Sequence, residues 1–400
     1  MSFTTGHSGP RIKDDCLVSF TPDDSPLRIG VVTTTEGADE SRVETAASRA
    51  AERLGIRSGD LRVEDCGAEP WVVAARVEAA LMECFPRLPR PTLPPATAWT
   101  ESSRHRPRRS RLYLPGDNPR FLAKGAESGA DGVILDLEDS VPPSRKSEAR
   151  VLVAHALSCL DFGRSEVMVR INQGETGLED LEWIVPQPVH LVLVPKVEYP
   201  SRVEEVSRRI ARIGKRCGRH EKIWLMPIVE SPLGVLDALE IAGASPSNVA
   251  LTIGLQDLSA EMGVMPTDHG RESFVARSLI VLAARAAGLQ PIDTVYADVK
   301  NEEGLLASIA AARELGFVGK GCIHPSQVQP VNQGFLPSRE EIEKAMKVVL
   351  AMEEAERQGL GAIALGSKMI DPPVAAQARN LIENAISMDL LGPDWRDSAG

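Results

Sequence analysis

Eight short runs of apolar, β-branched residues recur between residues 111 and 325, and longer segments with helical spacing separate them. This alternation is typical of βα units, in which crossover helices join parallel strands. Eight such units over about 220 residues predict a closed (β/α)₈ TIM barrel, an α/β fold. A doubly wound open sheet is the alternative that the pattern leaves open. The predicted strands are 111–115, 131–139, 166–172, 190–196, 222–231, 248–257, 293–300 and 319–325.

Other patterns flank this repeat. Residues 1–86 predict a small α+β domain, with strands at CLVSF, RIGVVTTT and LRVED and two helical segments. Residues 336–400 predict a C-terminal helical extension that follows a barrel domain of residues 109–335. The fold expected for the whole chain is therefore a small α+β domain, a barrel and a helical extension.

Residues 87–108 are rich in proline and arginine and show no helical or strand period. Such a composition predicts a semi-rigid, solvated linker. An arginine cluster at its end could attract an anionic nucleotide, but solvated side chains are the favoured interpretation. The cluster comprises Arg104, Arg106, Arg108, Arg109 and Arg111.

Net charge and cysteine spacing exclude several functions. A formal net charge of -11 argues against a surface that binds nucleic acid. No run approaches the roughly 18 apolar residues of a membrane span, and the N-terminus lacks the order of a secretory signal, so we expect a cytoplasmic protein with no membrane partner. The scattered cysteines show neither zinc-ligand nor disulfide spacing.

Polar residues end nearly every predicted barrel strand. In a closed barrel the carboxyl ends of all strands lie on one face, where barrel enzymes place their chemistry. Any single carboxylate there could be an ordinary helix cap or ion-pair partner, but the set converges on one mouth. The strand ends carry Asp136, Glu138, Asp139, Arg170, Asn172, Lys196, Glu230, Asp257, Asp298 and His324.

The ligands at this mouth are mostly oxygens, which favours a hard cation over zinc. Mg²⁺ commonly binds one or two protein carboxylates, keeps waters and leaves positions for substrate oxygens. Glu230 and Asp257, on neighbouring predicted strands, supply such a pair. Arg170 could clamp a substrate carboxylate with its planar fork of donors. The expected substrate is an anionic oxo- or hydroxy-acid.

Six motifs in this order resemble the HpcH/HpaI aldolase and citrate lyase β-subunit family. They are RSRLYLPGDNPRFLAKGAESGADGVILDLEDSVPPSRKSEAR, VRIN, LVPKVE, IVESPLG, IGLQDLSAEMG and GKGCIHPSQV. The resemblance implies a lyase that cleaves a β-hydroxyacyl thioester of the citryl, citramalyl or malyl type. It also implies roles for single residues. These are Glu230 and Asp257 as Mg²⁺ ligands, Arg170 as carboxylate clamp, Glu138 and Asp139 as orienting groups, and Arg109 and Lys124 as coenzyme A contacts.

The segment SKMIDPP resembles the C-terminal lid of acyl-thioester lyases. The resemblance implies that Asp371 enters the active site of a neighbouring subunit and transfers a proton there. It thereby also implies a homo-oligomer, a trimer or hexamer, that exchanges lids between subunits. The alternative is an ordinary acidic residue at a helix N-terminus.

Residues 1–86 resemble the acyl-carrier (γ) subunit of citrate lyase in the stretches IKDDCLVSFTP and EDCGAEPWVVAARVEAAL. The carrier bears its prosthetic group on a serine, whereas Lys13 stands at the matching position here. A lysine amine does not form the same phosphodiester linkage. We therefore expect a domain that docks a partner, and a free coenzyme A thioester as the substrate.

Two alternatives to this lyase remain open, namely different chemistry on the same fold and a non-catalytic role. A thioester hydrolase or a pyruvate-type aldolase could use the same fold, although Asp371 and a thioester requirement argue against the aldolase. A non-catalytic subunit of a citrate-lyase-like complex is the second alternative. The presence of Glu230, Asp257 and Arg170 together disfavours it.

Overall fold

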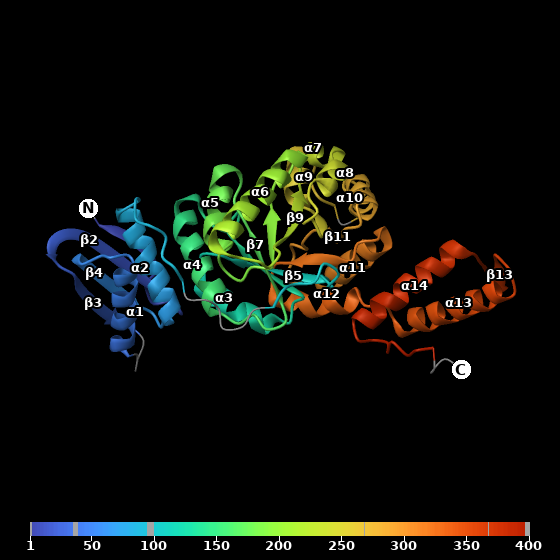
Figure 1. Ribbon diagram of the computed structural model, residues 1–400, viewed down its shortest axis with the longest axis horizontal. Coiled ribbons are helices and arrows are strands. Elements are labelled where there is room, and N and C mark those ends of the chain that lie inside the picture. The colour runs from blue at the N-terminus through green and yellow to red at the C-terminus, as the bar shows by residue number, and fades with distance from the viewer. Residues whose placement is uncertain (1, 35–38, 94–99, 268, 367, 397–400) are drawn as a thin grey trace. The chain divides into compact units, whose positions relative to one another are not determined.

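The computed structural model describes residues 2–34, 39–93, 100–267, 269–366 and 368–396. It divides into two units, one of residues 1–104 and 108–331 and the other of residues 105–107 and 332–400. The first unit contains the N-terminal domain and the barrel (Figure 1).

The N-terminal domain is a small α+β domain, as the sequence predicts, and consists of a four-stranded sheet and two helices. Its strand order is β1-β2-β4-β3, in which β4 pairs antiparallel with β2 and parallel with β3. The prediction missed β1, which adds an edge strand to β2. The elements are β1 (Phe3–Gly6), β2 (Cys16–Pro26), β3 (Arg28–Thr33), α1 (Glu40–Arg53), β4 (Ser58–Asp65) and α2 (Pro70–Cys84).

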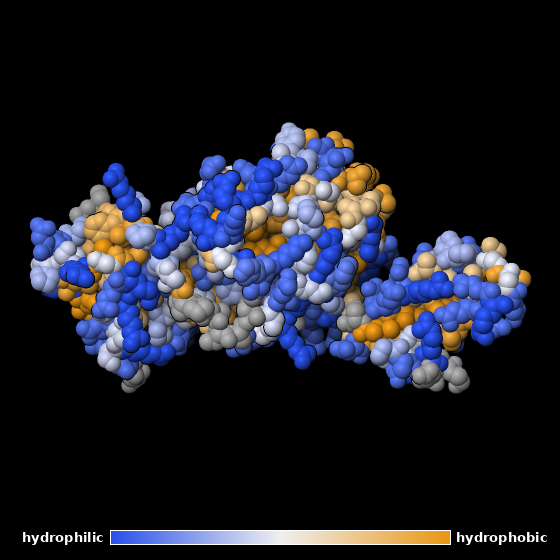
Figure 2. All heavy atoms as spheres, in the orientation of Figure 1, coloured by the Kyte–Doolittle hydropathy of each residue, from blue (hydrophilic) through white to orange (hydrophobic). Residues whose placement is uncertain are grey.

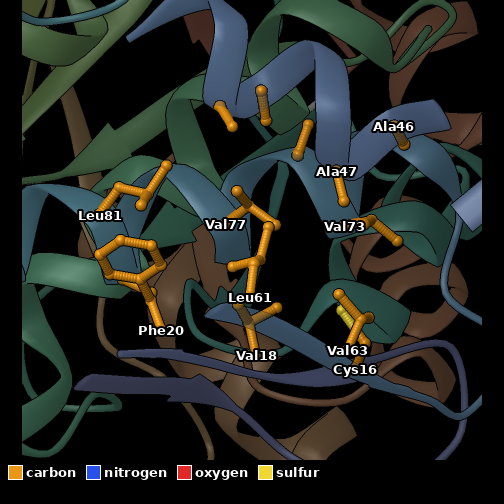
Figure 3. Close-up of a cluster of buried hydrophobic side chains, with 14 of the residues drawn as sticks. Cys16, Val18, Phe20, Ala46, Ala47, Leu61, Val63, Val73, Val77 and Leu81 are labelled. Atoms are coloured by element: carbon orange, nitrogen blue, oxygen red, sulfur yellow. The ribbon is translucent and has the colours of Figure 1, made fainter. Parts of the chain in front are cut away.

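Alternation along β2 and β4 builds the core of this domain. Val18 and Phe20 of β2 and Leu61 of β4 point from the sheet toward the helices, where Val73 and Val77 of α2 meet them (Figure 3). Successive strand residues face opposite sides of a sheet, so the residues between them stay polar. Helix α1 contributes only alanines and one valine to its buried face, which lets it pack close to α2.

The second part of this unit is a closed barrel of eight parallel strands in the order β10-β11-β12-β5-β6-β7-β8-β9. This confirms the TIM-barrel prediction and excludes the doubly wound sheet. The strands are β5 (Ser110–Pro115), β6 (Gly132–Asp136), β7 (Glu166–Arg170), β8 (Leu191–Val194), β9 (Trp224–Val229), β10 (Ala250–Ile253), β11 (Gln290–Asp293) and β12 (Gly319–Cys322).

Helices follow the barrel strands and cover the outside of the barrel (Figure 1). They are α3 (Pro119–Lys124), α4 (Lys146–Cys159), α5 (Gly174–Ile184), α6 (Pro200–Cys217), α7 (Pro232–Leu236), α8 (Ala238–Gly243), α9 (Leu255–Glu261), α10 (Phe274–Ala286) and α11 (Glu302–Leu315). Inside the barrel, alternate strand residues such as Ile134, Met168 and Met226 form a packed apolar core.

The sequence prediction was wrong for the seventh strand and for the arginine-rich end of the linker. The seventh strand is Gln290–Asp293, whereas the sequence predicted residues 293–300, because Pro291 gives the real strand a weak strand pattern. The arginine-rich end of the predicted linker is also not simply solvated. Arg108 is fully buried and pairs through its Nε with the equally buried Glu166 at 2.6 Å.

The C-terminal unit is a helical hairpin. Its parts are the end of α12 (Val328–Gly334), α13 (Arg339–Arg357), a small hairpin of β13 (Ile363–Leu365) and β14 (Lys368–Ile370), and α14 (Pro372–Ser387). Val349 and Met352 of α13 pack against Ala375 and Ile382 of α14. Among the residues described, no helix is long and apolar enough to cross a membrane.

Candidate active site

A cavity of about 210 Å³ opens at the carboxyl ends of the barrel strands. Its lining includes Asp136, Asp139, Arg170, Glu230 and Asp257, which sequence reasoning had assigned to one mouth. The barrel brings these residues together although they are spread over more than a hundred positions in sequence. The cavity is therefore the candidate active site.

Glu230 follows β9 directly and is 4% exposed. Its Oε1 accepts a hydrogen bond of 2.7 Å from the backbone N–H of Lys196. Burial raises the pKa of Glu230 to about 8. The nearby charges of Asp257 and Glu138 add to this shift, whereas the Lys196 hydrogen bond and the charge of Arg170 oppose it without cancelling it. The position therefore holds a carboxylate that lacks an adequate counter-charge.

Asp257 lies on the third residue of helix α9, whereas the sequence predicted that the β10 strand would run on to it. Gly254 ends the extended segment, and the chain turns at once into the helix. The side chain of Asp257 is 40% exposed and faces the same cavity as Glu230. Asp257 therefore lies in the first turn of a helix rather than on a strand, but it is still at the barrel mouth.

Lys196 is a member of this site to which sequence reasoning gave no role. Its Nζ lies 3.4 Å from Asp257 and 3.7 Å from both Glu138 and Asp139. Its backbone has φ 48°, a left-handed conformation that is uncommon for a residue with a side chain and is concentrated at functional sites. The sequence feature that could have pointed to a role for Lys196 is its position just after β8.

Arg170 reaches the site from the end of β7, as predicted, but its fork is engaged within the protein. Its Nε and Nη2 each donate to Asp136 at 2.6 Å, and its Nη1 lies 2.9 Å from Glu138. Its guanidinium also stacks 5.2 Å from the ring centroid of Tyr113. Burial by itself would raise the pKa of the Asp136 carboxyl, but the neighbouring Arg170 holds that pKa below its usual value. Asp136 thus fixes the arginine in place.

Glu138 and Asp139 also lie where the sequence predicted. Glu138 is buried and accepts a hydrogen bond of 2.9 Å from the amide of Gln173, and burial raises the pKa of its carboxyl. Asp139 is half exposed, with its carboxylate 3.5 Å from Arg170. Both carboxylates lie close to the cationic groups of Arg170 and Lys196 and can orient them.

Three other predicted residues do not line this cavity. Arg109 precedes β5, at the opposite end of the barrel from the mouth, and pairs bidentately with Asp131 at 2.7 Å. Lys124 is the exposed last residue of α3. Asp371 belongs to the C-terminal unit, where its carboxylate accepts from the backbone N–H of Val374 at 3.1 Å and caps α14.

The donor set fits a hard divalent cation. The ammonium of Lys196 already occupies a cation position among the carboxylates of Glu138, Asp139 and Asp257. No cluster of three or more histidine, cysteine or acidic residues with metal-binding geometry occurs in the described part of the chain. Two carboxylates supplemented by water and substrate oxygens are what Mg²⁺ requires. Glu230 and Asp257 are the pair that would hold it.

Gly254 makes room for Glu230. A Cβ built on Gly254 would collide with the Glu230 carboxylate and come within 2.9 Å of its Cβ. We expect Gly254→Ala to displace Glu230 and to weaken Mg²⁺ binding about tenfold to a hundredfold, as measured by calorimetry. Gly243→Ala in α8 is the control, because a Cβ there meets nothing within 4 Å. Equal Mg²⁺ affinities for both variants would contradict this assignment.

Comparisons with known proteins are consistent with this site. A family model described as HpcH/HpaI aldolase/citrate lyase matches residues 109–325, and one described as malonate decarboxylase delta subunit, an acyl-carrier model, matches residues 4–84. Citrate lyase subunit beta of Haemophilus influenzae is 38% identical over 283 residues, which cover 70% of this chain and 97% of the relative.

Two further relatives extend the comparison. The L-malyl-CoA/β-methylmalyl-CoA lyase of Cereibacter sphaeroides is 33% identical over 302 residues, covering 70% of this chain and 95% of the relative. The crystal structure of CitE from Mycobacterium tuberculosis in complex with magnesium, acetoacetate and coenzyme A superposes with a TM-score of 0.59 at 32% identity. It covers 71% of this chain and 99% of that one.

Proposed function

This chain belongs to the HpcH/HpaI aldolase/citrate lyase family, and from that membership we propose that it is a Mg²⁺-dependent carbon–carbon lyase. Its reaction is the reversible Claisen-type cleavage of a β-hydroxyacyl thioester to an acyl thioester and an oxo-acid. The observation that carries the proposal is the gathering of Glu230, Asp257 and Arg170 around one cavity at the barrel mouth.

The residues of the site have separate roles in the proposed reaction. Mg²⁺ held by Glu230 and Asp257 would supply Lewis-acid stabilisation of the negative charge that develops on the hydroxyl oxygen of the substrate. Arg170 is fixed by Asp136 at the rim, where the remaining N–H groups of its guanidinium can bind a substrate carboxylate. Glu138 and Asp139 orient Arg170 and Lys196.

Cleavage breaks the bond between the hydroxyl-bearing carbon and the carbon next to the thioester. The hydroxyl proton passes to solvent, the hydroxyl carbon becomes the carbonyl carbon of a ketone or aldehyde, and the electrons of the broken carbon–carbon bond pass to the thioester fragment as an enolate. In our proposal Asp371 of a neighbouring subunit then protonates that carbon. A thioester arm bound along the protein would hold the reacting bond in place.

Self-association has support on the barrel surface. Figure 2 shows apolar side chains gathered over α7, α8 and α10. Leu236, Leu239, Val275 and Leu282 are each more than half exposed in this region. A large exposed apolar patch marks an interaction site. It supports the proposal of a homo-oligomer, which we further propose to be a trimer or hexamer that exchanges lids.

The N-terminal domain is proposed to dock a partner, with a coenzyme A thioester as the substrate of the barrel. Lys13 lies in the loop between β1 and β2, where the carrier resemblance expects the prosthetic serine. Helix α2 of this domain packs against α4 of the barrel, and the buried Glu78 bonds His155 across this contact at 2.7 Å. The domain is thus fixed to the barrel through buried polar contacts.

A thioester panel tests the function directly. We expect the protein with Mg²⁺ to convert at least one of citryl-, citramalyl- and malyl-CoA to an oxo-acid and an acyl-CoA, and chelation of Mg²⁺ to stop turnover. The assay follows both products, because a hydrolase would release free coenzyme A and the intact hydroxy-acid. Absence of oxo-acid from all three substrates would contradict the proposed function.

A further inference from the structure

Arg111 is a buried arginine inside the barrel, and the proposed function leaves it without a role. It lies on β5 two residues before Tyr113, whose ring packs on the interior core, so both side chains share the inward face. Because the strand runs toward the mouth, Arg111 lies one layer deeper than Tyr113. It is 1% exposed, yet it lines the same cavity as Glu230 and Asp257.

No partner of Arg111 is an anion. Its Nη1 donates to the sulfur of Met226 at 2.9 Å, and its Nη2 lies 3.3 Å from the hydroxyl of Thr252 and 3.4 Å from the carbonyl of Asp293. Its Nε has no hydrogen-bond partner. Among the described residues, Arg111 forms no ion pair. A buried charge of this kind is costly unless it is paired.

The buried carboxylate of Asp293, near Arg111, is already paired with two other cations. Asp293 accepts from Arg277 at 2.9 Å and lies 2.7 Å from the Nζ of Lys320, both through its Oδ2. Two cations therefore share this carboxylate, and Arg111 adds a third positive charge that has no carboxylate of its own. Since an arginine does not deprotonate in a protein, the excess positive charge persists and attracts an anion from the cavity.

Resting on the function proposed above, we propose that Arg111 binds a second carboxylate of the substrate. The metal-binding carboxylates lie at the mouth, whereas Arg111 lies below them, so a substituent directed from the reacting carbon into the barrel meets its guanidinium. The preferred substrates are then thioesters whose cleavage releases a dicarboxylic oxo-acid. A citryl group carries this second carboxylate on a carboxymethyl substituent, where a citramalyl group carries a methyl group and a malyl group carries a hydrogen.

Substitution of Arg111 by methionine tests this assignment, because methionine keeps an apolar stem and removes the charge. We expect Arg111→Met to lower kcat/KM for citryl-CoA about a hundredfold or more and that for citramalyl-CoA less than threefold. Arg212→Met, an exposed arginine on α6, is the matched control and should change neither value. Equal losses on both substrates would overturn the proposal.

Binding of the oxo-acids separates this proposal from the proposed function. Calorimetry with Mg²⁺ should show that Arg111→Met weakens oxaloacetate binding about a hundredfold and leaves pyruvate binding unchanged. This result would support the subsite even if the enzyme cleaved no thioester of the panel. Unchanged oxaloacetate binding would overturn it even if cleavage were established.

A second substitution covers the case in which Arg111→Met does not fold. Arg111→Lys keeps the positive charge but replaces the planar fork by a single ammonium. We expect it to retain the preference for oxaloacetate over pyruvate at about a tenth of its original size. Melting temperature and far-UV circular dichroism establish that each variant is folded. A folded lysine variant with the full preference of the native protein would show that the guanidinium makes no such contact.

Discussion

Glu230→Gln is expected to lower turnover by at least about a thousandfold, because the loss of a metal-ligand charge removes several kcal/mol of transition-state stabilisation. Glutamine keeps the size of the side chain, so the 2.7 Å hydrogen bond from the Lys196 N–H can persist. Calorimetry should show a matching loss of Mg²⁺ affinity. Glu240→Gln, at an exposed position on α8, is the control. Unchanged turnover and Mg²⁺ affinity in Glu230→Gln would refute the metal assignment.

The same side chain sets a pH dependence. Burial raises the pKa of Glu230 from 4.5 to about 8 in the metal-free fold, so the carboxyl stays protonated below that pH. Mg²⁺ binds the ionised form, and its apparent affinity should rise by up to about tenfold per pH unit and level off near pH 8. Without Mg²⁺, the free energy of unfolding should decrease as the pH rises from 4.5 to 8, because the Glu230 carboxyl ionises more easily in the unfolded chain than in the folded one. Glu230→Gln should remove both effects.

Asp371→Asn is expected to lower turnover by about a hundredfold to ten-thousandfold, the usual contribution of a positioned proton donor. Asparagine caps a helix as well as aspartate does, so α14 should keep its N-terminus and the loss should be chemical. Mg²⁺ affinity should stay at the native value. Asp24→Asn, at an exposed position on β2, is the control.

Mixed oligomers then test whether Asp371 acts across subunits. Co-expression of Glu230→Gln with Asp371→Asn produces assemblies in which one subunit supplies an intact metal pair and another an intact Asp371. Turnover well above that of either single variant is the expected result. If both single variants are inactive and the mixture is also inactive, Asp371 acts within its own subunit. If Asp371→Asn retains native turnover, it has no catalytic role.

The barrel and most of its mouth were predictable from sequence. Strand periodicity and the polar residues at strand ends were sufficient to place Glu230, Arg170 and Glu138 on one face, because a closed barrel brings all strand ends together. Local signals also predicted both helices of the N-terminal domain. These features depend on the spacing of residues along the chain.

The features that sequence reasoning missed depend on depth within the barrel and on the backbone beyond the strand ends. Arg111 was grouped with a solvated arginine cluster, since sequence does not show which inward-facing residues lie beneath an open cavity. Lys196 was placed at the mouth but given no role, because sequence does not show its left-handed backbone or the three carboxylates around its ammonium. Asp257 moved to a helix because Gly254 ends its strand early. Each depends on three-dimensional packing rather than on periodicity.

Lys196 also limits the negative charge that accumulates at the barrel mouth. Its ammonium neutralises part of the acidic mouth, so those carboxylates are not left to repel one another and spread the loops that carry them. The side chain is 32% exposed, and exposed side chains change rotamer within nanoseconds. The mouth therefore carries its own counter-charge, and a cation that binds Asp257 has to displace the ammonium of Lys196. Because that displacement needs the rotation of one side chain, the mouth can exchange cations without refolding.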